Sequence, residues 1–343
     1  MEHYAGIDVS LESSSICVVD GSGRIIREAK VSSEPEALIS WFSGGFDLAR
    51  IGLEAGPLSQ WLYAGMREAG LKVELLETRH VRDAFKAMPV KTDRKDARGI
   101  AQLMRLGWFR SVHCKSLPAQ ELRAVLTARK LIQSKRQDVE MSVRGILRGF
   151  GLKVGHTTPR SFEGRIRELV SGHAMLEEIA DALLIARTSL GEQLARLQKR
   201  LVSLARDDQR ARLLMSTPGV GVLVALTYVA AIDDPGRFKS SKATGAHFGL
   251  TPKKHQSGET DVTGRISKIG DASVRTALYE AANVILTRPV KGSALKSWAM
   301  RVAKRAGMRK AKVALARKLA VTLHRMLADG TTFVAEKAAA VAA

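Results

Sequence analysis

Two carboxylates lie within or at the end of stretches that are typical of buried strands. Asp8 falls inside the apolar run 3–10, and Glu54 ends a second run at 47–54. Moving a carboxylate into a protein interior costs several kcal/mol unless it is paired or binds a metal ion. The sequence therefore predicts a compensating positive group close to Asp8. Plainer explanations are open on these stretches alone, because Asp8 could start a turn at an exposed strand end and Glu54 could close a strand before a Gly-Pro turn.

A second pair of carboxylates, Asp93 and Asp96, opens a stretch with helical periodicity that runs to Leu106. Residues three apart share one face of a helix. The pair also has an ordinary explanation, in which Asp93 caps the helix and Asp96 interacts favourably with its dipole. Together with Asp8 and Glu54, however, the pair predicts a site for two Mg²⁺ ions facing a phosphodiester, since these hard cations prefer oxygen ligands. The basic residues beside this pair in the sequence are Lys91, Arg94, Lys95 and Arg98.

These acids must be positioned by the elements predicted for the first third of the chain. Three strands with short turns, then a short helix, then strand, helix and strand is the order of an α/β domain of the ribonuclease H (RuvC-like) type. The first and fourth strands of such a sheet can lie side by side, which would bring Asp8 and Glu54 to one edge. The predicted strands are 3–10, 13–20, 24–31, 47–54 and 71–76, and the predicted helices are 35–42 and 58–69.

Residues 117–205 have a long, polar and helical pattern. The second half of this region repeats leucine at steps of seven, which is typical of a coiled-coil seam. These leucines are Leu176, Leu183, Leu190, Leu197 and Leu204. The pattern favours a helical coiled-coil arm, formed either as a hairpin within the chain or as a contact between chains. An amphipathic helix packed on its own domain is the alternative, disfavoured because few aromatic residues are present to fill a globular core.

The last third of the chain predicts a mostly helical domain with groups suited to phosphate contact. The run Thr217-Pro218-Gly219-Val220-Gly221 between two helical stretches resembles a helix-hairpin-helix element, whose backbone N–H groups at Gly219 and Gly221 could hold a phosphate. A plain helix start capped by Thr217 is the alternative. Farther along, a basic, glycine-punctuated loop between helices suits contact with a nucleic-acid backbone. Its candidate contact residues are Lys253, Lys254, Arg265 and Lys268.

Charge is distributed unevenly along the 343 residues. The chain has a formal net charge of +21, but residues 1–96 carry 12 Lys and Arg against 15 Asp and Glu, so the basic excess lies in the remainder. This distribution predicts a polyanionic partner, with nucleic acid favoured over an anionic membrane because the basic stretches have few aromatics to insert. The sequence contains no run of 18 apolar residues and no signal pattern, and its two cysteines match no metal spacing. We therefore expect a cytoplasmic protein that associates with the nucleoid and makes no membrane contact.

Several short motifs, taken in order, resemble one family. The runs Gly6-Ile7-Asp8, Gly52-Leu53-Glu54-Ala55-Gly56-Pro57 and Lys91-Thr92-Asp93-Arg94-Lys95-Asp96-Ala97 are similar to the four-acid motif of the DEDD-type insertion-sequence transposases, the family of the pilin-gene invertase and the bridge-RNA-guided recombinases. The run 217–221, the run Phe248-Gly249-Leu250-Thr251-Pro252 and the stretch 257–268 are similar to the C-terminal domain of that family. One departure is the pair Glu259 and Asp261, where relatives often carry basic residues.

The resemblance implies a site-specific DNA recombinase with three parts. These are a RuvC-like catalytic domain at 1–110, a coiled-coil arm at 117–205, and a transposase domain with a catalytic serine at 210–330. It also implies that the four acids hold Mg²⁺, that double-stranded DNA at element ends and targets is the substrate, and that a structured guide RNA selects it. Assembly as a homodimer or homotetramer is implied as well.

The serine of that resemblance corresponds to Ser257, which precedes Gly258 after the Gly-Leu-Thr-Pro turn. On sequence alone a loop serine before glycine is usually a turn residue. The other serines of the region lie near helix starts, where capping is the simpler explanation; they are Ser240, Ser241, Ser267 and Ser273.

Three other functions compete with recombination. A structure-selective nuclease of the Holliday-junction type would use the same acids with water. A sugar-kinase-like domain would need a second Asp-Gly phosphate loop, which the sequence lacks. A non-catalytic nucleic-acid binder would function without Asp8.

Overall fold

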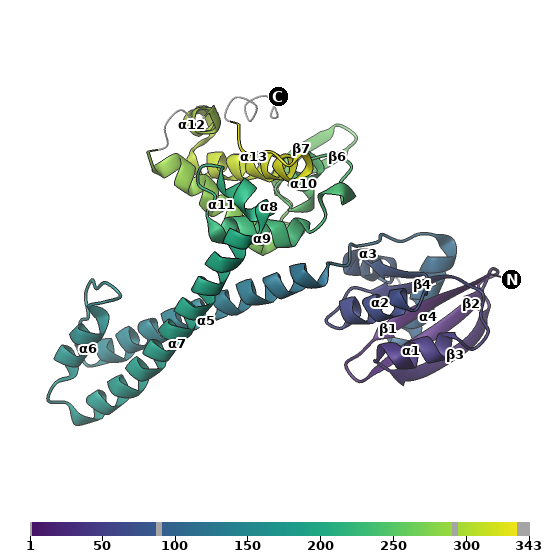
Figure 1. Cartoon of the computed structure of the whole chain (residues 1–343), viewed down its shortest axis with the longest axis horizontal. Coiled ribbons are helices and arrows are strands. Elements are labelled where there is room, and N and C mark those ends of the chain that lie inside the picture. Colours follow the sequence, from purple (N-terminus) through teal and green to yellow (C-terminus); the bar gives the residue numbers. More distant parts are fainter. Residues whose placement is uncertain (1, 87–90, 290–293, 335–343) are drawn as a thin grey trace. The chain divides into compact units, whose positions relative to one another are not determined.

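The computed structural model describes residues 2–86, 91–289 and 294–334, and divides the chain into two compact units, 1–115 and 116–343. The first is a mixed α/β unit and the second is largely helical (Figure 1). None of the helices in the described ranges is both long enough and apolar enough to cross a membrane. The helices predicted as a separate arm belong, by their contacts, to the second unit.

The first unit contains a five-stranded sheet in the order β3-β2-β1-β4-β5. The strands β1, β2 and β3 form an antiparallel meander, whereas β4 runs parallel to β1 and β5 parallel to β4. The predicted neighbourhood of the first and fourth strands is thereby confirmed. The strand bounds are His3–Val9 for β1, Ser13–Asp20 for β2, Ile25–Ser32 for β3, Leu48–Glu54 for β4 and Val73–Leu76 for β5.

Helices cover both faces of this sheet because the strands alternate apolar side chains to each side. On one face, α1 and α2 bury Leu38, Leu62 and Met66 against Ile7 and Leu53. On the other face lies α4, which buries its own apolar residues against the first, second and fourth strands. The helix bounds are Pro35–Phe42 for α1, Ser59–Glu68 for α2, Thr78–Ala84 for α3 and Asp93–Leu106 for α4.

The second unit begins with two long helices that pack on one another within the chain. These are α5 (Leu117–Gly149) and α7 (Ala174–Asp207), with the short α6 (Phe162–Val170) between them in sequence. A small core at the end of this pair includes Leu147, Phe162 and Leu184. In the structure α5 packs against α7 of the same chain, which is the intramolecular alternative that the leucine pattern left open.

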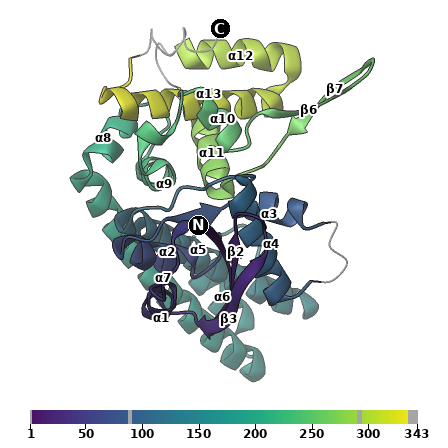
Figure 2. The same ribbon diagram turned by 90° about the vertical axis from the view of Figure 1, so that its right-hand side faces the viewer.

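The remaining elements of the second unit form a helical bundle around one apolar core. A two-stranded antiparallel hairpin of β6 and β7 projects from this bundle (Figure 2). The region had been predicted as a loop between helices, and that prediction is wrong. The element bounds are Gln209–Met215 for α8, Val222–Ile232 for α9, Pro235–Arg237 for the 3₁₀ helix η1, Ala243–His247 for α10, Pro252–Ser257 for β6, Thr260–Ile266 for β7, Ala272–Thr287 for α11, Ala294–Ala306 for α12 and Met308–Asp329 for α13.

Candidate active site

Asp8 and Glu54 lie on neighbouring parallel strands at matching positions. The strand register pairs Gly6 with Gly52, and each acid follows its glycine by two residues. Because side chains alternate along a strand, each acid lies on the same sheet face as its glycine. Both acids are half-buried. The sheet therefore brings these two predicted site residues together on the face that α4 covers.

The two glycines allow α4 to lie directly on the sheet. A Cβ atom at Gly6 would stand 2.2 Å from the carbonyl oxygen of Ala97, and one at Gly52 would stand 2.6 Å from Cγ2 of Ile100. Real Cβ atoms do not approach other atoms so closely, so only glycine permits this packing at Gly6. The glycine two residues before each acid therefore allows close packing of the helix that carries the other two acids.

The first turn of α4 adds Asp93 and Asp96. Thr92 is the N-cap, because its side-chain oxygen accepts a hydrogen bond from the backbone N–H of Lys95. The alternative in which Asp93 caps the helix is therefore wrong, and Asp93 is the first helical residue instead. Asp96 is buried, with 8% of its surface exposed, whereas Asp93 is exposed. Acidic residues in a first turn interact favourably with the helix dipole, which helps to hold this negative charge near Asp8.

The acids perturb one another electrostatically. The pKa of Asp8 is raised to about 6, mainly by burial and then by the charges of Asp96 and Asp93. The pKa of Glu54 is also raised, first by burial and then by Asp8. Lys91 acts in the opposite direction on both groups, and its Nζ lies 3.7 Å from Oδ2 of Asp96. All four acids therefore contribute to one region of excess negative charge.

The basic residues near these acids divide into two kinds. Arg94 and Arg98 are engaged by Glu28 of β3, with Arg94 Nε donating to Oε2 at 2.8 Å and Arg98 Nε donating to Oε1 at 2.5 Å. This ion-pair cluster ties the start of α4 to the sheet. Lys91 and Lys95 are exposed, which is compatible with the predicted contact to a polyanion, although Lys91 also forms an ion pair with Asp96. Arg94, which was predicted to contact nucleic acid, already has a carboxylate partner.

The donor set fits a divalent cation in its chemistry, since it consists of carboxylate oxygens, and burial together with neighbouring acids raises the pKa of Asp8 and that of Glu54. Across the described ranges of the chain, however, no three His, Cys, Asp or Glu side chains stand close enough together to hold an ion. An ion bound between Asp8, Glu54 and Asp96 would have to draw the carboxylates together.

Ser257 belongs to the second unit and is the last residue of β6. The hairpin turn follows it directly, with Gly258 in the left-handed region at φ +56°. Ser257 is exposed, so its hydroxyl is open to a large substrate. Its neighbour Lys254 pairs with Asp261 across the hairpin, Nζ to Oδ2 at 3.1 Å. Asp261 therefore neutralises the charge of Lys254, which is one of the predicted phosphate contacts. Lys253, another predicted contact, is exposed.

A second serine acquires a partner that the sequence did not reveal. The hydroxyl of Ser241 lies 2.9 Å from Nδ1 of His324, and Nε2 of that ring lies 3.2 Å from the carbonyl oxygen of Pro235. If Nε2 donates to Pro235, Nδ1 can accept from the serine. A serine next to an oriented histidine is a known nucleophile arrangement. Here the contact also ties the segment before α10 to α13, and the two partners lie 83 positions apart in the sequence, so no local pattern indicated the contact.

The turn between α8 and α9 gives its two glycines different surroundings. Gly219 has φ +80°, and a Cβ there would stand 2.7 Å from the carbonyl oxygen of Ala281 on α11. Gly219 therefore permits close packing on α11. Gly221 is the exposed N-cap of α9, which leaves it open to a ligand. The alternative in which Thr217 caps α9 is wrong, because Thr217 is buried and its hydroxyl contacts Sδ of Met326 at 3.4 Å.

The capping explanation offered for Ser267 and Ser273 is also wrong. Asp271 is the N-cap of α11, and its Oδ1 accepts from the backbone N–H groups of Ser273 and Val274.

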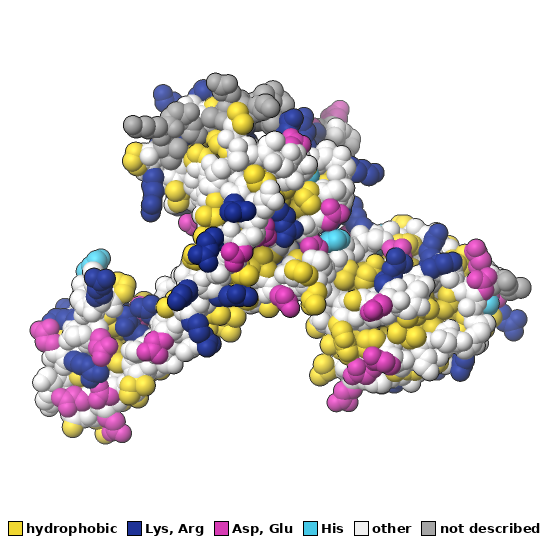
Figure 3. Space-filling model, in the orientation of Figure 1, with side chains coloured by type: hydrophobic (Ala, Val, Ile, Leu, Met, Phe, Trp, Pro, Cys, Tyr) yellow, Lys and Arg dark blue, Asp and Glu magenta, His cyan; other side chains and the backbone are white. Residues whose placement is uncertain are grey.

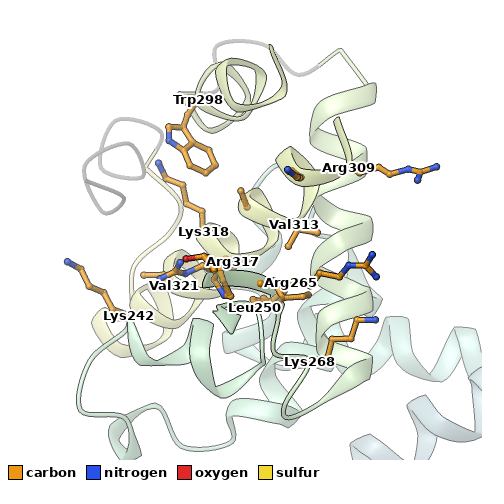
Figure 4. Close-up of a pocket in the computed structure, with 16 residues that line it drawn as sticks. Lys242, Leu250, Arg265, Lys268, Trp298, Arg309, Val313, Arg317, Lys318 and Val321 are labelled. Atoms are coloured by element: carbon orange, nitrogen blue, oxygen red, sulfur yellow. The ribbon is translucent and has the colours of Figure 1, made fainter. Parts of the chain in front are cut away.

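The remaining predicted contact residues, Arg265 and Lys268, line a groove in the second unit (Figure 4). On the face drawn in Figure 3, Lys and Arg side chains are spread along the paired long helices and over the bundle of this unit.

Two family models match the chain in the order of its two units. A DEDD transposase model matches residues 5–151, and a model for the transposase IS116/IS110/IS902 family matches residues 211–297. The chain is 28% identical over 310 residues to the transposase for insertion sequence element IS1111A of Coxiella burnetii (strain RSA 493 / Nine Mile phase I), which covers 88% of this chain and 83% of that protein.

It is also 27% identical over 251 residues to a protein named probable family 20 transposase from Pseudomonas aeruginosa PAO1, which covers 69% of this chain and 71% of that protein. Asp8 and Glu54 lie within the first match, and the hairpin of Ser257 lies within the second. The chain therefore belongs to the IS110-type family of DEDD transposases of insertion sequences.

Proposed function

We propose that this transposase cuts and rejoins double-stranded DNA at the ends of an insertion sequence, in the bacterial cytoplasm, with an acidic site in its first unit and a serine nucleophile in its second. The observation that carries the proposal is the convergence of Asp8, Glu54, Asp93 and Asp96 at one sheet face under α4. The strand order β3-β2-β1-β4-β5 supports a RuvC-like, ribonuclease H-type assignment for this unit.

The four acids would hold Mg²⁺, in one or two sites, with Asp8 and Glu54 from the sheet and Asp93 and Asp96 from α4. When bound, such ions polarise a phosphodiester and stabilise the charge that develops on its oxygens. The chain's own contribution is to hold Asp8 and Glu54 half-buried, so that burial and neighbouring negative charge raise the pKa of each of these two acids. Lys91 supplies a positive charge at the rim of this region.

Ser257 is the proposed nucleophile. Its oxygen would form an ester with the scissile phosphorus while the bond from phosphorus to one sugar oxygen breaks, and that sugar oxygen leaves as a hydroxyl after taking a proton. A hydroxyl of the second DNA strand then reverses the step, so no external energy source is needed. The exposed position of Ser257 beside a glycine turn supports this role, because a DNA backbone can approach it closely.

Two finer features of the proposal come from the family resemblance. A structured guide RNA would select the donor and target DNA, and the chain would act as a homodimer or homotetramer. The exposed cations of the second unit support a polyanionic partner (Figure 3). The paired helices α5 and α7 support the arm, whose coiled-coil character remains part of the proposal.

The test is to trap a covalent protein–DNA adduct on DNA that carries the ends of the element. Ser257→Ala should fold and bind DNA but give no adduct, whereas Ser241→Ala should give the adduct at the parental level. Peptide mapping of the trapped adduct then identifies the esterified serine. An adduct of normal yield on Ser257→Ala would overturn the assignment, and mapping to Ser241 would transfer the role to the serine beside His324.

The same assay separates recombination from hydrolysis. The acids of the first unit are gathered without any contribution from Ser257, an arrangement that a Holliday-junction type of nuclease also uses. If Ser257→Ala cleaves DNA at the parental rate and no variant forms an adduct, the chain is a nuclease.

A further inference from the structure

A large basic groove in the second unit has no role in the function proposed above. It has a volume of about 1050 Å³ and is lined by the base of the β6–β7 hairpin and by residues of α12 and α13 (Figure 4). Among its described lining residues there is no Asp or Glu. The cations that line its rim are Lys242, Arg265, Lys268, Arg309, Lys310 and Arg317. A concave site that is lined by positive charges and by no negative ones selects an anionic ligand.

One further cation of the groove, Lys318, is buried without a hydrogen-bond partner. Only 5% of this residue is exposed, and no described group accepts a hydrogen bond from its Nζ. Burial lowers the pKa of Lys318, and the charge of Arg301 lowers it further. A buried ammonium without an acceptor is unfavourable for folding. A cation–π contact with the indole of Trp298 offsets part of this cost, and an anionic oxygen of a ligand would supply the hydrogen-bond acceptor that is missing.

The groove also offers a surface for a flat apolar ring. The amine of Lys318 points toward the indole of Trp298, with Nζ 4.4 Å from the ring centroid (Figure 4). Leu250, Val313 and Val321 contribute apolar surface to the same lining. An indole beside aliphatic side chains is the kind of platform on which nucleobases stack.

We propose that this groove binds an unpaired nucleotide within a nucleic-acid strand, with the base against Trp298 and a phosphate oxygen on Lys318. Seven lining cations exceed the charge of a single nucleotide, which favours several consecutive phosphates over a free mononucleotide. A base inside a duplex cannot offer its face to the indole, so the groove selects a base that has left its stack.

The inference rests on the proposed function only in taking nucleic acid as the ligand. None of the four acids lines the groove, and neither does Ser257. Binding at the groove and chemistry at the acids can therefore be tested separately on the full-length chain.

The experiment measures fluorescence anisotropy of a labelled short oligothymidylate, of the matching oligouridylate, of a duplex of equal length and of labelled thymidine monophosphate. Trp298→Leu should weaken binding of the single strands about tenfold and leave duplex binding unchanged, because base stacking on one aromatic side chain contributes on this scale. Trp298→Phe should retain most of the affinity. Lys318→Met should weaken single-strand binding while raising the unfolding temperature, a combination that a purely structural lysine would not give.

Lys304→Met is the matched control, because this exposed lysine lies on α12 but does not line the groove. Parental single-strand affinity in both Trp298→Leu and Lys318→Met would overturn the inference. Equal weakening on single strands and duplex would also overturn it, since the groove would then hold backbone alone, and so would binding of the mononucleotide as tightly as the strand. A chain that forms no DNA adduct but keeps its Trp298-dependent preference for single strands would overturn the proposed function and leave this inference intact.

Discussion

Replacing Gly6 by alanine tests whether close seating of α4 on the sheet assembles the acidic site. The new Cβ would meet two backbone atoms of α4, the carbonyl oxygen of Ala97 at 2.2 Å and the nitrogen of Ala101 at 2.3 Å. Carbon contacts are most favourable at about 3.5 Å, so the helix must move outward by roughly 1 Å. Backbone atoms cannot rotate away, and the cost should therefore lie at the upper end for overpacking, about 3 kcal/mol.

The opposing effect on the free energy of unfolding is too small to turn the destabilisation by Gly6→Ala into a stabilisation. Alanine loses less conformational entropy on folding than glycine does, which stabilises a strand by about 0.5–1 kcal/mol. The net loss of about 2 kcal/mol should lower the unfolding temperature of the first unit by about 10 °C. The assay is thermal unfolding of the full-length chain by calorimetry, which reports the transitions of the two units, together with DNA cleavage at a temperature where the variant is folded.

Substitutions at two further glycines serve as comparisons for Gly6→Ala. Gly52→Ala would meet the flexible side chains of Ile100 and Met104, so its cost should be smaller, about 1 kcal/mol. Gly21→Ala has no atom within 4 Å of the new Cβ and should unfold like the parent. Unfolding of Gly6→Ala at the same temperature as Gly21→Ala would refute the packing argument. Full DNA cleavage by a destabilised Gly6→Ala would refute the claim that the seat of α4 positions Asp93 and Asp96.

Two other substitutions test the electrostatics of the first unit. Hydrogen bonds from Arg98 and Arg94 hold the pKa of Glu28 near 2, so this ion-pair cluster stabilises the fold above the ordinary glutamate pKa and is lost as pH falls from about 4.5 toward 2. Because both arginines are partly exposed, Glu28→Gln should cost no more than about 1 kcal/mol near neutral pH. It should also flatten the dependence of unfolding temperature on pH in that window, and an unchanged slope would contradict the pairing. Asp8→Asn should abolish DNA cleavage, keep nucleic-acid binding in a gel-shift assay and raise the unfolding temperature, because it removes a charge that burial and the neighbouring acids disfavour. Loss of binding together with cleavage would mean that Asp8 is a structural residue.

The sequence alone predicted most of the helices and strands and named four acids as a candidate site. Strand and helix patterns are local, so the meander, the parallel β4 and β5, and the long helices α5 and α7 were predictable from periodicity and turn residues. The pairing of β1 with β4 followed from the element order and brought Asp8 and Glu54 together as expected. Side chains two residues apart in a strand lie on the same face of the sheet, which explains why the sequence could indicate that Asp8 and Glu54 share a face.

The tertiary structure decided what the local pattern could not contain. In the sequence, Gly6 and Gly52 look like ordinary strand residues. Only the structure shows that they allow α4 to pack closely on the sheet. The sequence pattern predicts a loop where the structure has the β6–β7 hairpin, because short polar strands that are exposed on both faces show no apolar alternation. Likewise, Thr92 rather than Asp93 proved to be the cap of α4.

The groove and the Ser241–His324 contact arise only when distant segments meet. Lys318 is buried against Trp298 of another helix, and Ser241 finds its histidine on α13. Periodicity reports that a side chain is buried, but it does not report which element buries it, because that depends on the packing of segments far apart in the chain. The four acids could be named as candidates from the sequence, whereas the burial that raises the pKa of Asp8 and that of Glu54, and the packing of Lys318 against Trp298, are consequences of the fold.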